Sequence, residues 1–187
     1  MATIVLRPDN TTSETGWDSS TIHDIIGDND TGTSTTQNQS TCNFTGRLEN
    51  LTATLSSATI NSVTISLTAS PGRRGTATAV LSLVHPSDGA FIAETESYSS
   101  GTTTETTTAR TTQQDGSSAL TFAYINDCEV KIAPDGQGIT AIELFVTVDY
   151  TQIPIIANIA KVMGVESVDI AKVNSIDATD IEKVIGI

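Results

Sequence analysis

The stretch NSVTISLTA, residues 61–69, decides the fold class. Apolar residues alternate in it with Ser and Thr, which is the period of a β-strand that buries one face. The same alternation recurs in residues 76–85 and 139–150. Turn signals rich in Pro and Gly separate these runs, and no long helical pattern is present that could connect parallel strands. We therefore expect an all-β fold, an antiparallel β-sandwich.

Shorter runs add further expected strands. Residues 3–7 alternate until Pro8 breaks the pattern, and residues 91–98 form another strand candidate. Residues 101–112 hold eight Thr, which fits an exposed strand better than a flexible linker.

Two segments near the C-terminal end of the sandwich are predicted to form a hairpin, because turn residues 134–138 separate residues 128–132 from residues 139–150. One helical turn is expected at residues 21–26, and a short helix or crossover at residues 119–125. The residues of the last strand that should share a buried face are Ile142, Leu144, Val146 and Val148.

Composition supports this fold and excludes several partners. The 187 residues include 32 Thr and 19 Ser, and β-branched Thr suits the outer face of a sheet better than a helix interior. The formal net charge of −13 would repel the phosphates of nucleic acid and anionic lipid. No segment has the pattern of a signal peptide or a membrane span. We expect neither a nucleic acid nor a membrane as partner.

The sequence changes character at residues 150–154, so we divide it into a β-sandwich domain, 1–152, and a C-terminal tail, 153–187. The tail repeats at a step of 11 residues, as IAKVMGV (159–165), IAKVNSI (170–176) and IEKVIGI (181–187). This period also suits one continuous helix. However, each copy has a β-branched run and a Gly or Ser at one fixed position, which disfavours an unbroken helix. We predict short helical turns joined by tight bends, with Asp169 and Asp180 as possible caps.

One repeat is too small to bury its own Ile and Val residues, so the copies must stack on one another, on the sandwich or on a partner chain. A self-packed cap and docking on other subunits both stay open, and we favour docking because the sandwich is already complete at Tyr150. The positions assigned to this assembly interface are Ile159, Val162, Val165, Ile170, Val173, Ile176, Ile181 and Val184.

The order of motifs in the sandwich domain resembles a β-sandwich module of many bacteriophage and environmental-virus proteins. The motifs are Leu6-Arg7-Pro8 with Gly16-Trp17, residues 62–67 and 75–78, and a last strand that ends in Asp149-Tyr150. The resemblance implies a jelly-roll sandwich, related in shape to carbohydrate-binding modules, and a viral context. It implies no catalytic residue.

The tail is similar to the Ile-x-Lys-Val-x-Gly-Val repeats that end many phage virion proteins. Those repeats usually carry Asn-Gly at the bend. Here the pairs are Met163-Gly164, Asn174-Ser175 and Ile185-Gly186.

The sequence contains no known motif for catalysis or for binding a cofactor. His23 and His85 stand alone, without metal ligands at useful spacing. Residues 28–32, DNDTG, faintly resemble a calcium loop but lack its spaced ligand and distant Glu, so we interpret them as a solvated acidic turn. We expect no cofactor and no enzymatic activity.

Sugar sites often stack a ring on an aromatic side chain, and few aromatic residues are available. The candidates are Trp17, Tyr98, Tyr124 and Tyr150, whereas the four Phe residues are assigned to the core. Trp17 is either a ligand platform or a partly buried anchor that holds the first loop to the sandwich.

The chain has two cysteines, Cys42 and Cys128. They form either one disulfide or two buried thiols, and we favour the thiols.

These observations lead to one functional hypothesis and two alternatives. We expect a non-enzymatic phage virion protein, assembled in the host cytoplasm, that decorates the particle or serves as an attachment subunit on the capsid or tail. Its partners would be further copies of itself and other virion proteins. The alternatives are a tail-fibre adhesin that binds a host surface glycan and a subunit of an extracellular filament.

Overall fold

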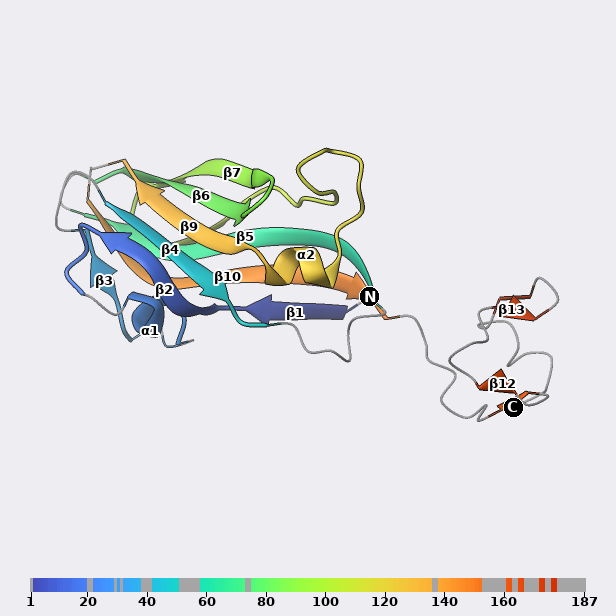
Figure 1. The fold of residues 1–187 in the computed structure, drawn as a ribbon. Coiled ribbons are helices and arrows are strands. Elements are labelled where there is room, and N and C mark those ends of the chain that lie inside the picture. The colour runs from blue at the N-terminus through green and yellow to red at the C-terminus, as the bar shows by residue number, and fades with distance from the viewer. Residues whose placement is uncertain are drawn as a thin grey trace. The chain divides into compact units, whose positions relative to one another are not determined.

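Two antiparallel β-sheets form the sandwich, and the computed structural model gives their order directly. Sheet A runs β1 (Ala2–Leu6), β10 (Ile139–Thr151), β5 (Thr59–Pro71) and β8 (Thr103–Thr106), with β3 (Thr35–Thr36) also paired to β10. Sheet B runs β2 (Pro8–Thr15), β4 (Asn43–Leu48), β9 (Glu129–Pro134), β6 (Ala77–His85) and β7 (Gly89–Tyr98). Figure 1 shows the strands of sheet B side by side in one layer, with β1, β10 and β5 in the layer behind. The predicted antiparallel β-sandwich is confirmed.

The chain divides into two compact units, residues 1–152 and residues 153–187. The residues that the structure describes are 2–19, 22–28, 30, 32–37, 42–50, 58–72, 75–135, 138–152, 161–162, 165–166, 172–173 and 176–177.

The core lies between the two sheets and is built from the alternating faces that the sequence predicts. In β5, Val63, Ile65 and Leu67 are fully buried. Leu81 and Leu83 of β6 face them from sheet B and are also fully buried. Each large apolar side chain buried in this way contributes about 1.5–3 kcal/mol. The two sheets therefore hold together through their inner faces.

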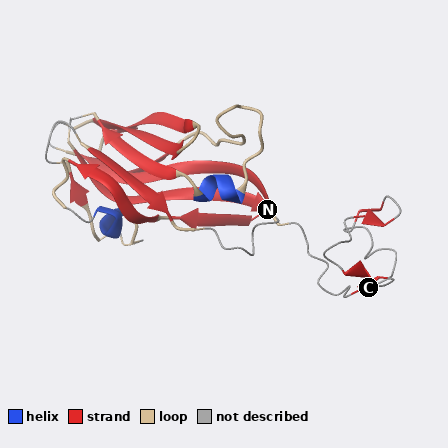
Figure 2. Cartoon of the chain, viewed as in Figure 1, coloured by secondary structure: helices blue, strands red, loops and turns tan. Residues whose placement is uncertain are grey.

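Strands predominate in the described residues, and two short helices lie among them (Figure 2). α1 (Ile22–Ile26) and α2 (Phe122–Asn126) form where residues 21–26 and 119–125 predicted a helical turn. The Thr121 hydroxyl caps α2 by accepting a hydrogen bond from the backbone N–H of Tyr124. In the described part of the chain, no helix is long and apolar enough to cross a bilayer.

Residues 128–132 and 139–150 do not form the predicted hairpin. β9 pairs with β4 and β6 in sheet B, whereas β10 pairs with β1 and β5 in sheet A. The turn between them therefore carries the chain from one sheet to the other. The first strand ends just before Pro8, as predicted, but Pro8 also begins the next strand, since the chain leaves sheet A at Leu6 and enters sheet B as β2 at Pro8.

A β-bulge in β10 corrects the predicted face of that strand. Ala141 pairs with Ala69 and Glu143 with Thr68, which leaves Ile142 as the extra residue. Ala141 and Leu144 are fully buried, but Ile142 is only half-buried. The bulge shifts the alternation by one residue, so Ile142 does not share the buried face of Leu144, Val146 and Val148.

The tail contains β-hairpins where short helical turns were predicted. β11 (Lys161–Val162) pairs with β12 (Val165–Glu166), and β13 (Lys172–Val173) pairs with β14 (Ile176–Asp177). Two residues separate the strands of each pair, which is the connection length of a tight hairpin turn. The β-branched residues that disfavour a helix favour these strands. The third repeat, residues 181–187, lies outside the described residues.

Candidate functional site

The structure places Trp17 in the core of the sandwich. Trp17 is 7% exposed, and its indole Nε1 donates a hydrogen bond to the backbone oxygen of Asn43 at 2.9 Å. A β-bridge to Gln37 ties the same residue to a neighbouring segment. A stacking platform needs an open ring face, so the burial of Trp17 argues against that role and favours the anchor.

The other aromatic residues offer no open platform either. Tyr98 and Tyr124 are buried, and Tyr150 packs edge to face against Phe122. Phe145, which the sequence assigned to the core, instead lies half-buried on the outer face of sheet A, because it alternates with buried Leu144 and Val146.

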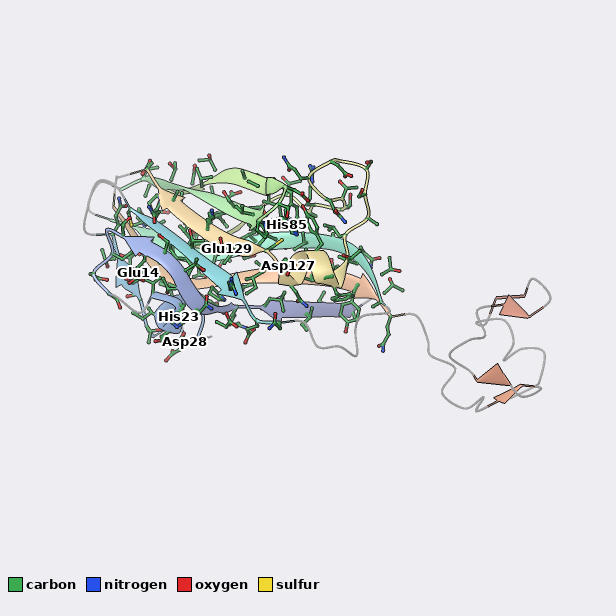
Figure 3. The ribbon with its side chains drawn as sticks, in the orientation of Figure 1. Glu14, His23, Asp28, His85, Asp127 and Glu129 are labelled. Atoms are coloured by element: carbon green, nitrogen blue, oxygen red, sulfur yellow. The ribbon has the colours of Figure 1, made fainter. Side chains whose placement is uncertain are left out.

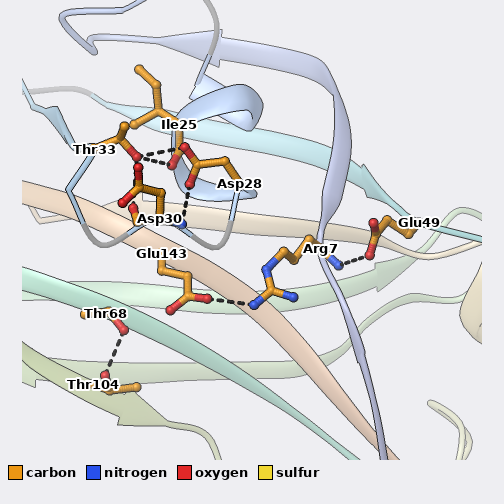
Figure 4. Close-up of polar contacts among 9 residues, drawn as sticks. All are labelled: Arg7, Ile25, Asp28, Asp30, Thr33, Glu49, Thr68, Thr104 and Glu143. Carbon is orange, nitrogen blue, oxygen red and sulfur yellow. Dashed lines mark hydrogen bonds and ion pairs between the residues drawn. The ribbon is translucent and has the colours of Figure 1, made fainter.

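Arg7 lies over the ring of Phe145. Its guanidinium carbon is 6.0 Å from the ring centroid, which is within the range of a cation–π contact. The same guanidinium pairs with Glu143 at 2.8 Å (Figure 4). The exposed side of Phe145 therefore already has a partner from its own chain.

The polar motifs singled out in the sequence make contacts within the fold. His23 Nδ1 lies 2.8 Å from the Thr11 hydroxyl, and the His85 ring stacks on Tyr124 with centroids 4.1 Å apart. The Asp28 carboxylate accepts hydrogen bonds from the Asp30 backbone N–H and the Thr33 hydroxyl (Figure 4). No three His, Cys, Asp or Glu side chains among the described residues could hold a metal ion together.

The tail positions assigned to assembly fall into two groups. Val162, Val165, Val173 and Ile176 lie in the paired strands β11 to β14. Those outside the described residues are Ile159, Ile170, Ile181 and Val184.

A polar pocket lies at one end of sheet B and was not predicted from the sequence. Its volume is about 400 Å³, which is within the range of small-ligand sites. The strands β2, β4 and β9, the turn at Pro86 and the end of α2 surround it. The lining residues are Asp9, Asn10, Arg47, Leu48, Asn50, Pro86, Asn126, Asp127 and Glu129.

Strand register brings three of these residues into one row. Asn10 is opposite Arg47, and Arg47 is opposite Glu129. Directly opposite residues project from the same face of a sheet, here the outer face, since the neighbouring Leu48 is buried. Asp9 joins the row because it is the extra residue of a bulge in β2, between Pro8 and Asn10.

The C-terminal end of α2 contributes further residues to the lining of the pocket. Asn126 is the last residue of the helix, and Asp127 follows it as the C-cap. Figure 3 shows Asp127 and Glu129 at the start of β9, with His85 close by. The chain from Asn126 to Glu129 thus places an amide and two carboxylates along one wall of the pocket.

The charged side chains of the pocket have no partners among the described residues. The ion pairs found there are Arg7–Glu143, His23–Asp24 and His85–Asp88. Arg47 contributes its backbone N–H to Asn10 Oδ1 at 3.3 Å, but its guanidinium makes no ion pair with the described carboxylates. Charges of both signs therefore line one pocket without a direct ion pair among the described residues.

This arrangement suits recognition of a polar ligand. Carboxylates accept hydrogen bonds, guanidinium groups donate them, and amides do both. The described lining holds no Ser, Cys or His that could act as a nucleophile with an adjacent base. The pocket therefore presents hydrogen-bond donors and acceptors to a ligand.

The pocket residues are spread from Asp9 to Asn50 and from Pro86 to Glu129 with no regular spacing, so they form no motif in the sequence. A weak signal was present in Asn126-Asp127-Cys128-Glu129, a polar run between two apolar segments. Only the pairing of β4 with both β2 and β9 brings these segments together.

No family model and none of the curated proteins matches the chain. Among solved structures, the C-terminal CBM6 of LamC, a marine laminarinase from Zobellia galactanivorans, is similar with a TM-score of 0.43 and 8% identity, over 79% of this chain and 98% of that one. The carbohydrate-binding module CBM6cm-2 of Cellvibrio mixtus lichenase 5A, in complex with cellotriose, is similar with a TM-score of 0.40 and 10% sequence identity. The match covers 80% of this chain and 98% of that module. The enzymatically active domain of bacteriophage CBA120 tailspike protein 4 is similar with a TM-score of 0.36 and 14% sequence identity. The match covers 79% of this chain and 19% of that one.

Proposed function

We propose that this chain is a glycan-binding module that holds its ligand in the polar pocket without cleaving it. The observation that carries the proposal is the group of charged side chains, Arg47, Asp127 and Glu129, that line the pocket without an ion pair among the described residues. A sugar presents adjacent hydroxyls that both donate and accept hydrogen bonds, and planar amide, carboxylate and guanidinium groups can bridge them.

Other ligand classes fit the pocket less well. A nucleic acid phosphate would meet three carboxylates and one guanidinium. An apolar ligand would find only Leu48 and Pro86 as apolar lining, and Leu48 is 2% exposed. A hydroxylated ligand is the class whose chemistry matches both the donors and the acceptors.

Replacing Arg47 or Glu129 with alanine should weaken binding of the recognised glycan at least tenfold, since a hydrogen bond to a charged group contributes about 1.5–3 kcal/mol. The measurement is an oligosaccharide array screen of the full chain, followed by calorimetric titration of each variant. Mass spectrometry of the oligosaccharide after incubation shows whether it stays intact, as a non-catalytic module requires.

The matched control is Lys131→Ala. Lys131 is a cation two residues beyond Glu129 on β9, on the same face of sheet B, but it does not line the pocket. We expect near wild-type affinity for Lys131→Ala. Equal losses in Lys131→Ala and Arg47→Ala, or binding that survives both pocket variants, would place the ligand elsewhere.

We propose, as a second candidate function, that the chain is a virion structural subunit whose tail docks on other subunits. Supporting this role, the tail hairpins repeat at an 11-residue step with the same register, since Lys161 opposes Glu166 and Lys172 opposes Asp177. A glycan-binding sandwich and a docking tail are compatible in one attachment protein, which would reside on the virion.

Removing the tail should lower the oligomeric state. We expect the full chain to form a defined oligomer in light scattering over a concentration series, and a chain that ends at Gln152 to be a monomer. The full chain with Val162, Val173 and Val184 changed to Asp should behave like the shortened chain. Monomers in all three cases would rule out self-assembly through the tail, and unlimited growth of the full chain would indicate a filament subunit.

A further inference from the structure

The pocket carries an excess of negative charge. Asp9, Asp127 and Glu129 contribute three carboxylates, and Arg47 contributes one guanidinium. The whole chain adds to this field, because its formal net charge is −13. The three carboxylates and one guanidinium leave the pocket lining with a net charge of −2, which favours a cationic ligand over an anionic one.

Arg47 offsets only one of these three negative charges. It is opposite Glu129 in the strand register, yet the two side chains form no ion pair. Asp9 and Asp127 also lack an ion-pair partner among the described residues. The carboxylates outnumber the guanidinium by two and form no ion pair with it, so they are available to accept hydrogen bonds from a cationic ligand.

We infer that the pocket binds an amino sugar, a hexosamine unit whose nitrogen is a free ammonium group. This inference rests on the proposed glycan-binding function and names the ligand class. The ammonium group would donate charge-assisted hydrogen bonds to the carboxylates of Asp127 and Glu129, which adjoin on one wall. The ring hydroxyls would bind the amides of Asn10, Asn50 and Asn126 and the guanidinium of Arg47.

The same geometry discriminates against related sugars. Acetylation of the nitrogen removes its charge and leaves only a neutral amide donor, so the charge-assisted bonds are lost. A uronic acid adds a carboxylate to a pocket that already holds three. Affinity should therefore fall from the amino sugar to its N-acetyl form and fall further for the uronic acid.

The test compares three hexasaccharides, of glucosamine, N-acetylglucosamine and galacturonic acid, by calorimetric titration of the full chain near pH 6 in physiological salt. We expect glucosamine hexamer to bind at least ten times more tightly than its N-acetyl form, with no binding of galacturonic acid hexamer. The double variant Asp127→Asn and Glu129→Gln should lose this preference, because amides keep the shape and hydrogen-bonding capacity but not the charge.

A second double variant, Glu96→Gln and Glu105→Gln, separates pocket binding from general attraction between a polycation and an acidic protein. It changes the net charge by the same amount. In the β6–β7 hairpin, Glu96 is opposite Ala79, whereas Gly89 is opposite His85 at the turn beside the pocket. Glu96 therefore lies about six residues, or roughly 20 Å, from that turn. This control should keep the full preference for glucosamine.

Each other outcome has a distinct meaning. Tighter pocket-dependent binding of the N-acetyl form overturns the amino-sugar inference and leaves the proposed function standing. If both double variants lose the preference for glucosamine equally, the preference comes from the net charge of the whole protein, and the inference is also overturned. If no oligosaccharide of any class binds, both the inference and the proposed function fail.

Discussion

Replacing Gly46 with alanine is expected to lower the free energy of unfolding by about 3 kcal/mol. Gly46 lies in the middle of β4, with its inner side against the core. A Cβ atom at this position would lie 2.6 Å from the backbone oxygen of Asn10 and 2.6 Å from Cζ of Phe44. Phe44 is fully buried, so its ring has no free space to enter, and the oxygen of Asn10 belongs to the neighbouring strand.

Chemical denaturation of matched variants measures this effect. The control is Gly116→Ala, where the backbone has φ +73° and the new Cβ meets nothing within 4 Å, so only the strain of about 1 kcal/mol applies. A loss for Gly46→Ala no larger than for Gly116→Ala would contradict the packing argument. Adding Phe44→Leu should cost less in the Gly46→Ala background than alone, since the ring atoms that clash are then gone.

Gly46 also shows why the sequence predicts which face of a strand is buried better than it predicts which strands lie side by side. Phe44, which the sequence assigned to the core, is fully buried, and Leu48 is buried on the same face, because burial follows the period of the strand. Nothing in that period indicates that β2 crosses close to Gly46, with a bulge on each side of Asn10 and Thr11. Close approach depends on tertiary pairing, which a single strand does not encode.

The misassigned hairpin of β9 and β10 has the same cause. Both strands bury one face, and a turn of Pro and Gly residues separates them. This pattern fits a hairpin within one sheet and a crossing between two sheets equally well. In a sandwich the two inner faces have the same composition, so the partner of each strand is decided by the whole topology.

The helical turns predicted for the tail are wrong for a more local reason. The 11-residue period is compatible with helices, but Met163-Gly164 and Asn174-Ser175 each follow Lys-Val and precede Val-Glu or Ile-Asp. Two residues that include Gly or Asn between β-branched residues are a hairpin signal. The strand pairs β11–β12 and β13–β14 have the register that this signal predicts.

The pocket could not be predicted, since its chemistry appears only when distant segments meet. Asn10, Arg47 and Glu129 are separated by long stretches of sequence and become neighbours through two strand pairings. Aromatic residues were the wrong guide here, because a sandwich of this size needs most of its few large rings in the core.

The buried cysteines should resist alkylation about a thousandfold more strongly than an exposed thiol. Cys42 is 4% exposed and Cys128 is fully buried, and burial raises the pKa of each thiol from 9.0 to about 12. The reactive thiolate is then about a thousand times rarer at pH 8 than for an ordinary cysteine. Cys128 also donates a hydrogen bond to the backbone oxygen of Tyr124 at 3.1 Å.

Both thiols are free, and the fold keeps them apart. Cys128 precedes β9, and the register of β4 with β9 places Cys42 opposite the far end of that strand, about six residues or roughly 20 Å away. A disulfide needs Cα atoms within about 7 Å, so the single bridge considered from the sequence cannot form in this fold.

Mass spectrometry after iodoacetamide treatment at pH 8 tests the reactivity. The matched control is Ser97→Cys, an exposed position on β7, which should be labelled at the ordinary rate in the same chain. Denaturant should make Cys42 and Cys128 react like the control. Labelling of either native thiol within tenfold of the Ser97→Cys rate would show that the core opens far more readily than this packing allows.

The same pKa shifts predict the alkaline limit of stability. Between pH 9 and about 12 the folded chain keeps the protons of both thiols while the unfolded chain loses them, so the free energy of unfolding falls as pH rises through this window. Below pH 9 both states are protonated and the thiols add no pH dependence. The double variant Cys42→Ala and Cys128→Ala should therefore lose less stability than wild type between pH 8 and about pH 11. Identical losses in denaturant titrations of the two proteins would show that other groups, such as the buried Tyr98, set the alkaline limit.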